Sequence, residues 1–170
     1  MPGWSPEIAN EFIRRGLREG RAFDQMQLQK LVYIAHGWCL AFSGEPLTGD
    51  RPEAWDFGPV YRRLADALQG YGTQSVDQEI ASDWSISNAF RQSSHPRVAT
   101  TDLNGFETDT ILMVYEDYGV FSAPQLSVLT QRNGSPWAQV YANGSGKLRD
   151  VPHTLIRYQF VRYAKEAETD

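Results

Sequence analysis

Apolar residues recur at the three- and four-residue spacing of an amphipathic helix in several separate stretches of the chain. The clearest stretch begins after Asp24, which has capping-box spacing to Gln27, and it ends at Gly44. It predicts a helix whose apolar side carries Leu28, Leu31, Val32, Ala35, Trp38, Cys39 and Phe42.

A less apolar stripe accompanies this apolar side. Lys30, Tyr33 and His36 recur every three residues, which places them roughly on one neighbouring stripe of the same predicted helix. We interpret this stripe as a surface that can meet a partner.

Start signals made of Ser and Pro mark other helices. Ser caps helix N-termini and Pro suits the first helical turn, so Ser5-Pro6, Ser122-Ala123-Pro124 and Ser135-Pro136 each predict a helix start. Together with the apolar spacing and the following glycines, they predict helices over residues 5–18, 107–118, 122–133, 135–141 and from about 152 onward.

The stretch EAWDFGPVY, residues 53–61, reads as a corner between a strand and a helix. The alternation over residues 51–57 predicts an extended strand with Trp55 and Phe57 on one buried face. Gly58 permits a sharp change of direction, and Pro59 presets the first turn of a helix that continues to about Leu68.

Asp56 precedes this predicted helix. A carboxylate ahead of a helix N-terminus is stabilised by free backbone N–H groups, so we interpret Asp56 as a capping residue rather than a general base.

These elements predict a mainly α protein, a compact domain of about six helices with a small β element. Residues 70–103 are polar and weakly periodic, apart from a brief alternation at 83–86 and a turn signal at His95-Pro96. We treat them as a variable excursion that contains a short unassigned element. No repeat, linker or low-complexity tract divides the chain, so residues 1–170 are predicted to form a single domain.

Composition and charge narrow the function classes. The net charge of −5 argues against broad binding to a phosphate backbone, although a local basic patch remains open as an alternative, using Arg14, Arg15, Arg18, Arg62 and Arg63. The single cysteine, Cys39, falls in an apolar helical pattern and is read as a core residue. With neither an export signal nor a long apolar run, the sequence predicts a cytoplasmic protein that does not enter the membrane.

The sequence offers no arrangement that predicts catalysis. Three histidines and one cysteine lack the short ligand spacings of a zinc site. The run Gly144-Ser145-Gly146-Lys147 fails as a phosphate loop, because Tyr141 and Leu148 stand where Gly and Ser or Thr are required. We therefore predict neither a metal nor a cofactor, no catalytic residue and no enzymatic activity.

Ordered blocks of sequence resemble the Panacea domain family of antitoxin-associated proteins, also described as phage-associated, GepA-like or SocA-like. QLQKLVYIAHGW, residues 27–38, is similar to the first helix motif of the family, and GEPL, residues 44–47, to the turn after it. EAWDFGPVY at 53–61 resembles the central signature. The C-terminal half is matched in the same order by residues 114–119, 126–130 and 135–137, with Gln131 standing where the family pattern carries a His.

This resemblance implies a non-catalytic antitoxin, often of phage or prophage origin, that neutralises a toxin by direct protein binding. The partner it implies is a cognate toxin encoded by an adjacent gene. The resemblance also implies, for at least one type of member, an adaptor that delivers its toxin to the ClpXP protease. A phage or prophage host-interaction protein and a nucleic-acid-binding protein remain as alternatives.

Two sets of residues follow as site predictions. The family signature is expected to be structural, with the tryptophans in the core, and it comprises Trp38, Trp55, Phe57, Gly58, Pro59 and Trp137. The corner and the arginine side of the first helix are expected to border the partner, which nominates Lys30, Tyr33, Asp56, Arg14, Arg15 and Arg18.

Overall fold

The computed structural model describes residues 2–82 and 98–170, which form seven α-helices and one antiparallel pair of strands. The mainly α class with a small β element is confirmed, with seven α-helices in place of about six. The elements in chain order are α1 (Ser5–Arg18), α2 (Gln25–Ser43), β1 (Glu53–Trp55), β2 (Gly58–Val60), α3 (Arg62–Leu68), the 3-10 turn η1 (Gln69–Tyr71), α4 (Gly105–Tyr118), α5 (Ala123–Thr130), α6 (Pro136–Tyr141), the 3-10 turn η3 (Ala142–Gly144) and α7 (His153–Thr169).

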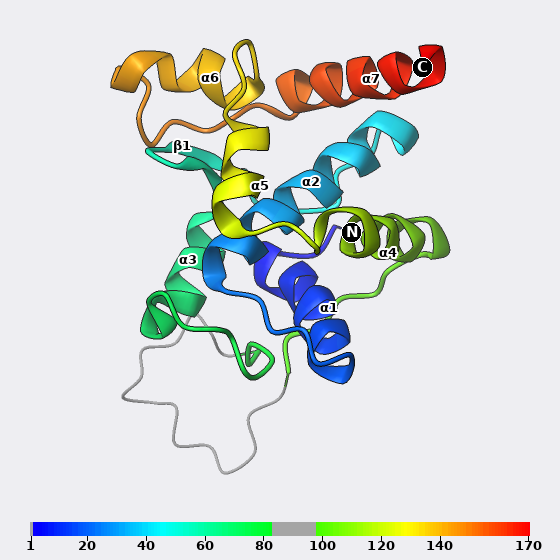
Figure 1. Cartoon of the computed structure of the whole chain (residues 1–170), viewed down its shortest axis with the longest axis vertical. Coiled ribbons are helices and arrows are strands. Elements are labelled where there is room, and N and C mark those ends of the chain that lie inside the picture. The colour runs from blue at the N-terminus through cyan, green and yellow to red at the C-terminus, as the bar shows by residue number, and fades with distance from the viewer. Residues whose placement is uncertain (1, 83–97) are drawn as a thin grey trace.

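Helix α2 forms the centre of the molecule. It packs against α1, α3, α4, α5, α7 and β2, and Figure 1 shows α7 crossing on one side of it and α1 and α4 on the other. All residues from Leu28 to Gly37 are buried, because neighbours cover every side of the helix. The sequence predicted an amphipathic helix with one open stripe, and that part of the prediction is wrong.

The boundaries of α2 follow the predicted signals. The Asp24 side chain accepts from the Gln27 N–H at 2.8 Å, and the Gln27 side chain accepts from the Asp24 N–H at 2.9 Å. Gly44 ends the helix in the left-handed region, with φ of 77°. Ser122 and Ser135 cap α5 and α6 as predicted, because each accepts a backbone N–H with its side chain.

Two other helix starts differ from the prediction. Ser5 is the first residue of α1 and not its cap, and its N–H and hydroxyl both donate to the Asp50 carboxylate at 2.8 and 2.5 Å. Helix α4 begins at Gly105, two residues earlier than predicted, because Asn104 accepts from the Glu107 N–H at 2.9 Å.

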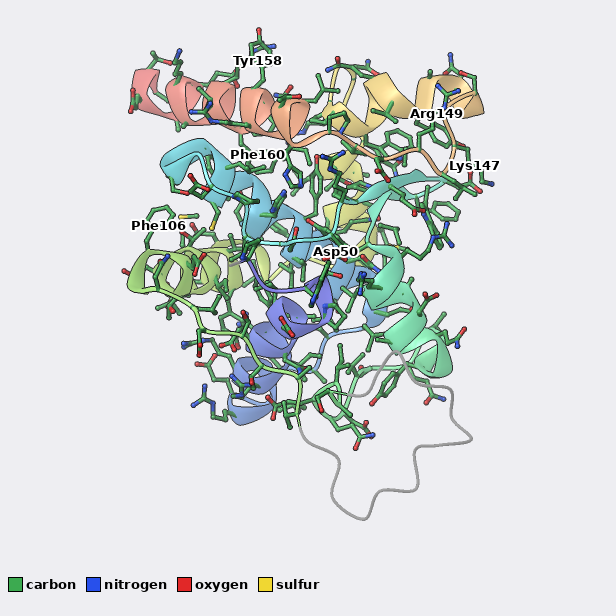
Figure 2. The ribbon with its side chains drawn as sticks, turned by 180° about the vertical axis from the view of Figure 1, so that it is seen from behind. Asp50, Phe106, Lys147, Arg149, Tyr158 and Phe160 are labelled. Atoms are coloured by element: carbon green, nitrogen blue, oxygen red, sulfur yellow. The ribbon has the colours of Figure 1, made fainter. Side chains whose placement is uncertain are left out.

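Helix α7 packs closely along α2. Ile156 and Phe160 are buried in this contact, and Figure 2 shows Phe160 pointing from α7 toward α2. The Phe160 ring lies so near Gly37 that any Cβ at that position would overlap it. Gly37 therefore sets the close approach of the two helices.

The excursion after α3 is attached to α1 at both of its described ends. Asn10 is buried and donates to the carbonyl oxygens of Ile80 and Ala99 at 2.8 and 2.9 Å, while its own oxygen accepts from the Ile80 N–H. The 3-10 turn η1 lies at the start of this segment. The predicted alternation at 83–86 and the His95-Pro96 turn lie outside the described residues.

Candidate partner-binding surface

The predicted corner is a β-hairpin. Strand β1 pairs with β2 in the register Glu53 to Val60, Ala54 to Pro59 and Trp55 to Gly58. This register leaves Asp56 and Phe57 as a two-residue turn. The prediction that Trp55 and Phe57 share a buried face is wrong, since Phe57 is 68% exposed and Ala54 is the buried residue of β1.

The hairpin also moves the helix start. Pro59 lies in β2 rather than opening a helix, and α3 begins three residues later at Arg62. Asp56 therefore does not cap α3, and the capping interpretation is wrong. The physical reason is Gly58, whose φ of +107° lets the chain turn back on itself after only two residues.

A loop from another part of the chain completes the hairpin. The Leu148 N–H donates to the Ala54 carbonyl at 2.7 Å, and the Ala54 N–H donates to the Arg149 carbonyl at 2.8 Å. The outer edge of β1 is thereby paired with backbone from the segment before α7. In this segment Ala142, Asn143 and Leu148 all adopt positive φ, a strained conformation for residues with a side chain.

Asp56 binds this same loop and the last residue of α6. Its carboxylate accepts from Lys147 Nζ and from the Tyr141 hydroxyl, each at 2.8 Å. These two hydrogen bonds, that of Lys147 first, lower the pKa of Asp56. The ion pair is open to solvent, so it contributes little to stability. It keeps a negative and a positive charge side by side at the hairpin tip.

We call this region the hairpin platform and define it by the residues that line its hollow of about 360 Å³, Met26, Trp55, Asp56, Phe57, Val60, Lys147 and Leu148. Phe57 and Leu148 are exposed, and Trp55 is half-buried under the Arg62 guanidinium, 5.4 Å from the ring centre. A second hollow of about 330 Å³ shares Met26, Trp55 and Val60. Apolar side chains beside an exposed ion pair are typical of a protein-binding surface.

Lys30 lies beneath the platform, inside the protein. Its side chain is 0% exposed and Nζ donates to the Pro59 carbonyl at 2.9 Å. Burial lowers the pKa of Lys30 to about 7. The Gly58 Cα packs against this amine and against Thr130 Oγ1, which would lie 3.1 and 2.8 Å from a Cβ at position 58.

Tyr33 is also buried, and its ring packs edge-on against Phe160 of α7. Burial, with a smaller contribution from Tyr163, raises its pKa. Because Lys30 and Tyr33 are enclosed, the structure places neither of them with Asp56 on one open surface. Their assignment as partner contacts stays a prediction. In the structure, Lys30 supports β2 through Pro59, and Tyr33 packs in the contact between α2 and α7.

The arginines of α1 lie apart from the hairpin (Figure 1). Arg14 binds Glu11 and Glu79 at 2.9 and 2.6 Å, and Arg15 lies 5.6 Å from the centre of the Tyr115 ring. Arg18 is exposed at the end of the helix. Arg62, which the sequence grouped with these arginines as an alternative basic patch, lies at the hairpin instead and binds Glu53 at 2.8 Å.

The signature tryptophans make specific hydrogen bonds. Trp137 donates from Nε1 to the Trp55 carbonyl at 2.7 Å, which fastens α6 to β1. Trp38 donates from Nε1 to the Tyr118 hydroxyl at 3.3 Å and stacks on Phe42. Trp38, Trp55 and Trp137 are all partly rather than fully buried, so each joins the core to the surface.

Two of the histidines, the buried His36 and the half-buried His153, form a pair. The rings of His36 and His153 lie 4.6 Å apart, and His36 Nδ1 accepts from the Thr48 N–H at 3.2 Å. Burial, with a smaller contribution from His153, lowers the pKa of His36 to about 3. Across residues 2–82 and 98–170, no group of three or more His, Cys, Asp or Glu side chains is arranged to hold a metal ion.

Comparisons with known proteins bear on this surface. Residues 28–138 match the family model described as "Antitoxin SocA-like, Panacea domain". The chain belongs to this family. A curated relative, Antitoxin SocA of Caulobacter vibrioides (strain NA1000 / CB15N), is 31% identical over 140 residues, which is 82% of this chain and 70% of the relative. No solved structure matches the chain.

The Panacea match begins inside α2, includes the hairpin, α3, α4 and α5, and ends inside α6. Lys147 and Leu148, which complete the platform, lie beyond it. Sequence reasoning missed both of these residues, and no local pattern marks them, because Lys147 bonds Asp56 and Leu148 bonds Ala54 across about ninety positions of chain. Gln29 was also missed. Its side-chain amide donates to the Tyr61 carbonyl and accepts from the Tyr61 N–H, and a polar residue inside an apolar helix pattern was the available signal.

In the parts of the chain that the structure describes, no helix is long and apolar enough to span a bilayer.

Proposed function

We propose that this protein is an antitoxin that acts in the cytoplasm and neutralises a cognate toxin by binding it directly, without catalysis of its own. The observation that carries the proposal is the match of residues 28–138 to the SocA-like Panacea family. The toxin is proposed to be the product of an adjacent gene.

The hairpin platform is the surface we assign to this contact. Exposed Phe57 and Leu148 offer an apolar centre, and aromatic side chains in such positions commonly dominate binding energy. Asp56 and Lys147 add two opposite charges at its rim, which favour a correctly oriented partner over others.

The strained loop supports this assignment. Positive φ values at Ala142, Asn143 and Leu148 cost conformational energy, and such strain persists where the surrounding structure imposes it. At Leu148 the conformation is held by the hydrogen bonds of Leu148 and Arg149 to Ala54 of β1, and Lys147 and Leu148 line the same hollow as Phe57.

The experiment that tests the proposal is growth of a bacterial host that expresses each gene adjacent to this one, with and without this chain supplied from a second plasmid. We expect one neighbour to arrest growth and this chain to restore it. If no neighbour is toxic, or if a toxic neighbour is not rescued, the antitoxin proposal fails.

We further propose that neutralisation proceeds through delivery of the toxin to the ClpXP protease. Delivery and simple occlusion differ in the fate of the toxin. With this chain present, the half-life of the toxin should fall in cells that have ClpX and stay long in cells that lack it. A toxin that is neutralised at an unchanged half-life would leave binding in place and exclude delivery.

A further inference from the structure

A third hollow, separate from the two beside the hairpin, lies between α2, α7 and the ends of α4 and α5. Its volume is about 280 Å³, and we call it the α2–α7 groove. Helix α2 forms the floor, α7 forms one wall, and the C-terminal ends of α4 and α5 with the start of α6 form the other. The lining residues are Tyr33, Ile34, Trp38, Tyr118, Leu129, Thr130, Arg132, Ser135, Pro136, Gln159, Phe160, Tyr163 and Ala167.

Apolar and aromatic side chains make up most of the groove lining. Phe160 and Trp38 form a T-shaped pair with ring centres 5.1 Å apart, and Tyr163 packs edge-on against Phe160 at 5.5 Å. On α7 the lining positions Gln159, Tyr163 and Ala167 are spaced by four residues, so the wall is about two helical turns long, or roughly 12 Å.

One end of the groove carries hydrogen-bond donors. The Tyr118 hydroxyl accepts from Trp38 Nε1, so its own proton is free to point into the groove. The charge of Arg132 lies close enough to act on the pKa of Tyr118. Arg132 is exposed and, among the described residues, makes no ion pair within 4 Å. A cation and a hydroxyl that converge in this way suit a carboxylate.

The helical walls of the groove favour an added helix over an added strand. Helices satisfy their own backbone groups, so walls of this kind offer no free N–H and C=O row to an added strand. An apolar groove two turns long, with a donor pair at one end, is complementary to an amphipathic helix. Apolar side chains at i, i+4 and i+7 would fill it, and an acidic residue beside them would meet Arg132 and Tyr118.

We propose that the α2–α7 groove binds an amphipathic helix of the toxin, oriented by a carboxylate of that helix on Arg132 and Tyr118. This inference rests on the proposed antitoxin function and adds a second contact, separate from the hairpin platform. It predicts that the toxin loses affinity when the groove is obstructed, even if the platform is intact.

The test uses the full chain and the toxin identified by growth rescue, as purified proteins. Ala167→Arg places a long side chain at the open end of the groove, on an exposed residue of the last turn of α7 where folding is not at risk. Thr169→Arg adds the same charge to the same turn at a position that does not line the groove. We expect Kd to rise at least about tenfold for Ala167→Arg and to stay within about twofold for Thr169→Arg.

Charge reversal tests the orientation. Arg132→Glu should raise Kd about tenfold, whereas Arg162→Glu, an exposed arginine outside the groove, should not. A photoreactive phenylalanine at Tyr163 should crosslink to an apolar helix of the toxin with an acidic residue beside it, and reversing that acid to Lys should restore binding to Arg132→Glu. The same probe at Tyr158, which does not line the groove and points from α7 away from α2 in Figure 2, should not label that helix.

The outcomes separate the two claims. If the wild-type chain rescues growth while Ala167→Arg and Arg132→Glu bind as tightly as wild type, the groove proposal is overturned and the antitoxin function stands. If the wild-type chain neither rescues nor binds any neighbouring product, both are overturned. If Ala167→Arg instead changes the oligomeric state of the isolated chain, the groove holds a second copy and the proposal is wrong.

Discussion

The Nζ atom of Lys30 lies 2.9 Å from the carbonyl oxygen of Pro59, so a lysine of α2 holds strand β2 from inside the protein. The lysine is fully buried, and the hydrogen bond joins the central helix to the hairpin that carries the candidate binding surface. Support for that surface therefore comes from a group whose charge is costly to bury.

Lys30 predicts an unusual pH dependence. Its pKa is about 7 in the folded state and 10.5 in a free side chain, so between these values the unfolded chain binds more protons than the folded one. The free energy of unfolding then rises with pH, by about 2 kcal/mol between pH 7 and 9. Well below pH 7 Lys30 is protonated in both the folded and the unfolded chain, so the cost of burying its charge no longer changes with pH. Urea unfolding at several pH values measures this slope. Lys30→Met should flatten it, and an equal slope in both proteins would show that Lys30 is not its source.

Gly58 is predicted to be intolerant of a side chain. Its φ of +107° lies in the region that favours glycine, and a Cβ there would lie 2.8 Å from Thr130 Oγ1. Gly58→Ala should lower the free energy of unfolding by about 2–3 kcal/mol. Gly70→Ala is the matched control, because no atom lies within 4 Å of its added methyl group. Similar denaturation midpoints for the two variants would argue against the strain at Gly58.

His36 predicts a loss of stability in mild acid. Its pKa is about 3 in the folded protein and 6.5 in a free side chain, so the unfolded chain takes up a proton first as pH falls. The contribution is fully present above pH 6.5 and is lost progressively below it, by about 1 kcal/mol per pH unit between pH 6 and 4. Because the carboxylates Asp50 and Asp56 also titrate in acid, the informative quantity is the difference from His36→Asn. This variant should remove that part of the slope, and an unchanged acid profile would contradict the assignment.

Several helix starts and ends were predictable because they depend on neighbours in the chain, although the starts of α1, α3 and α4 differ from the prediction. The Asp24–Gln27 box, the left-handed Gly44 and the Ser-Pro starts of α5 and α6 are local devices, and each is confirmed. The hairpin was not predictable in the same way. Whether the chain continues into a helix after Trp55 or turns back at Asp56-Phe57 depends on Gly58 and on the buried amine that bonds Pro59.

Only part of the candidate surface could be predicted from the sequence. Trp55, Asp56 and Phe57 were selected by their motif, although their orientation was assigned wrongly for Phe57. Tyr141 at the end of α6 and Lys147 in the following loop, which bind Asp56, lie about ninety residues later in the chain, and such pairing is a property of the tertiary fold. Burial of Lys30 was missed for the same reason, because a lysine on a mixed stripe gives no local sign that other elements cover it.

Phe57 is the residue whose removal should separate binding from folding. It is 68% exposed, so Phe57→Ser should change the melting temperature by less than about 2 °C while it weakens toxin binding at least about tenfold. Phe106→Ser removes another exposed phenylalanine, on α4 at the opposite side of the molecule from Lys147 (Figure 2). That control should affect neither quantity. Equal losses of binding in both variants would contradict the assignment of the platform.

Substitution of Asp56 should also weaken toxin binding, but by less than Phe57→Ser does. Its ion pair with Lys147 is exposed, so Asp56→Asn leaves the fold intact and alters the charge pattern at the rim of the platform. Neutralisation of the toxin should weaken without a fall in melting temperature. A parallel fall in both would assign Asp56 a purely structural role.

Neutralisation of a toxin by direct contact is best measured as the affinity of the purified chain for the purified product of the toxic neighbouring gene. We expect a stable complex with a Kd below about 1 µM, weakened at least about tenfold by Phe57→Ser and unaffected by Phe106→Ser. Rescue of growth without any detectable complex between the two proteins would contradict neutralisation by direct contact.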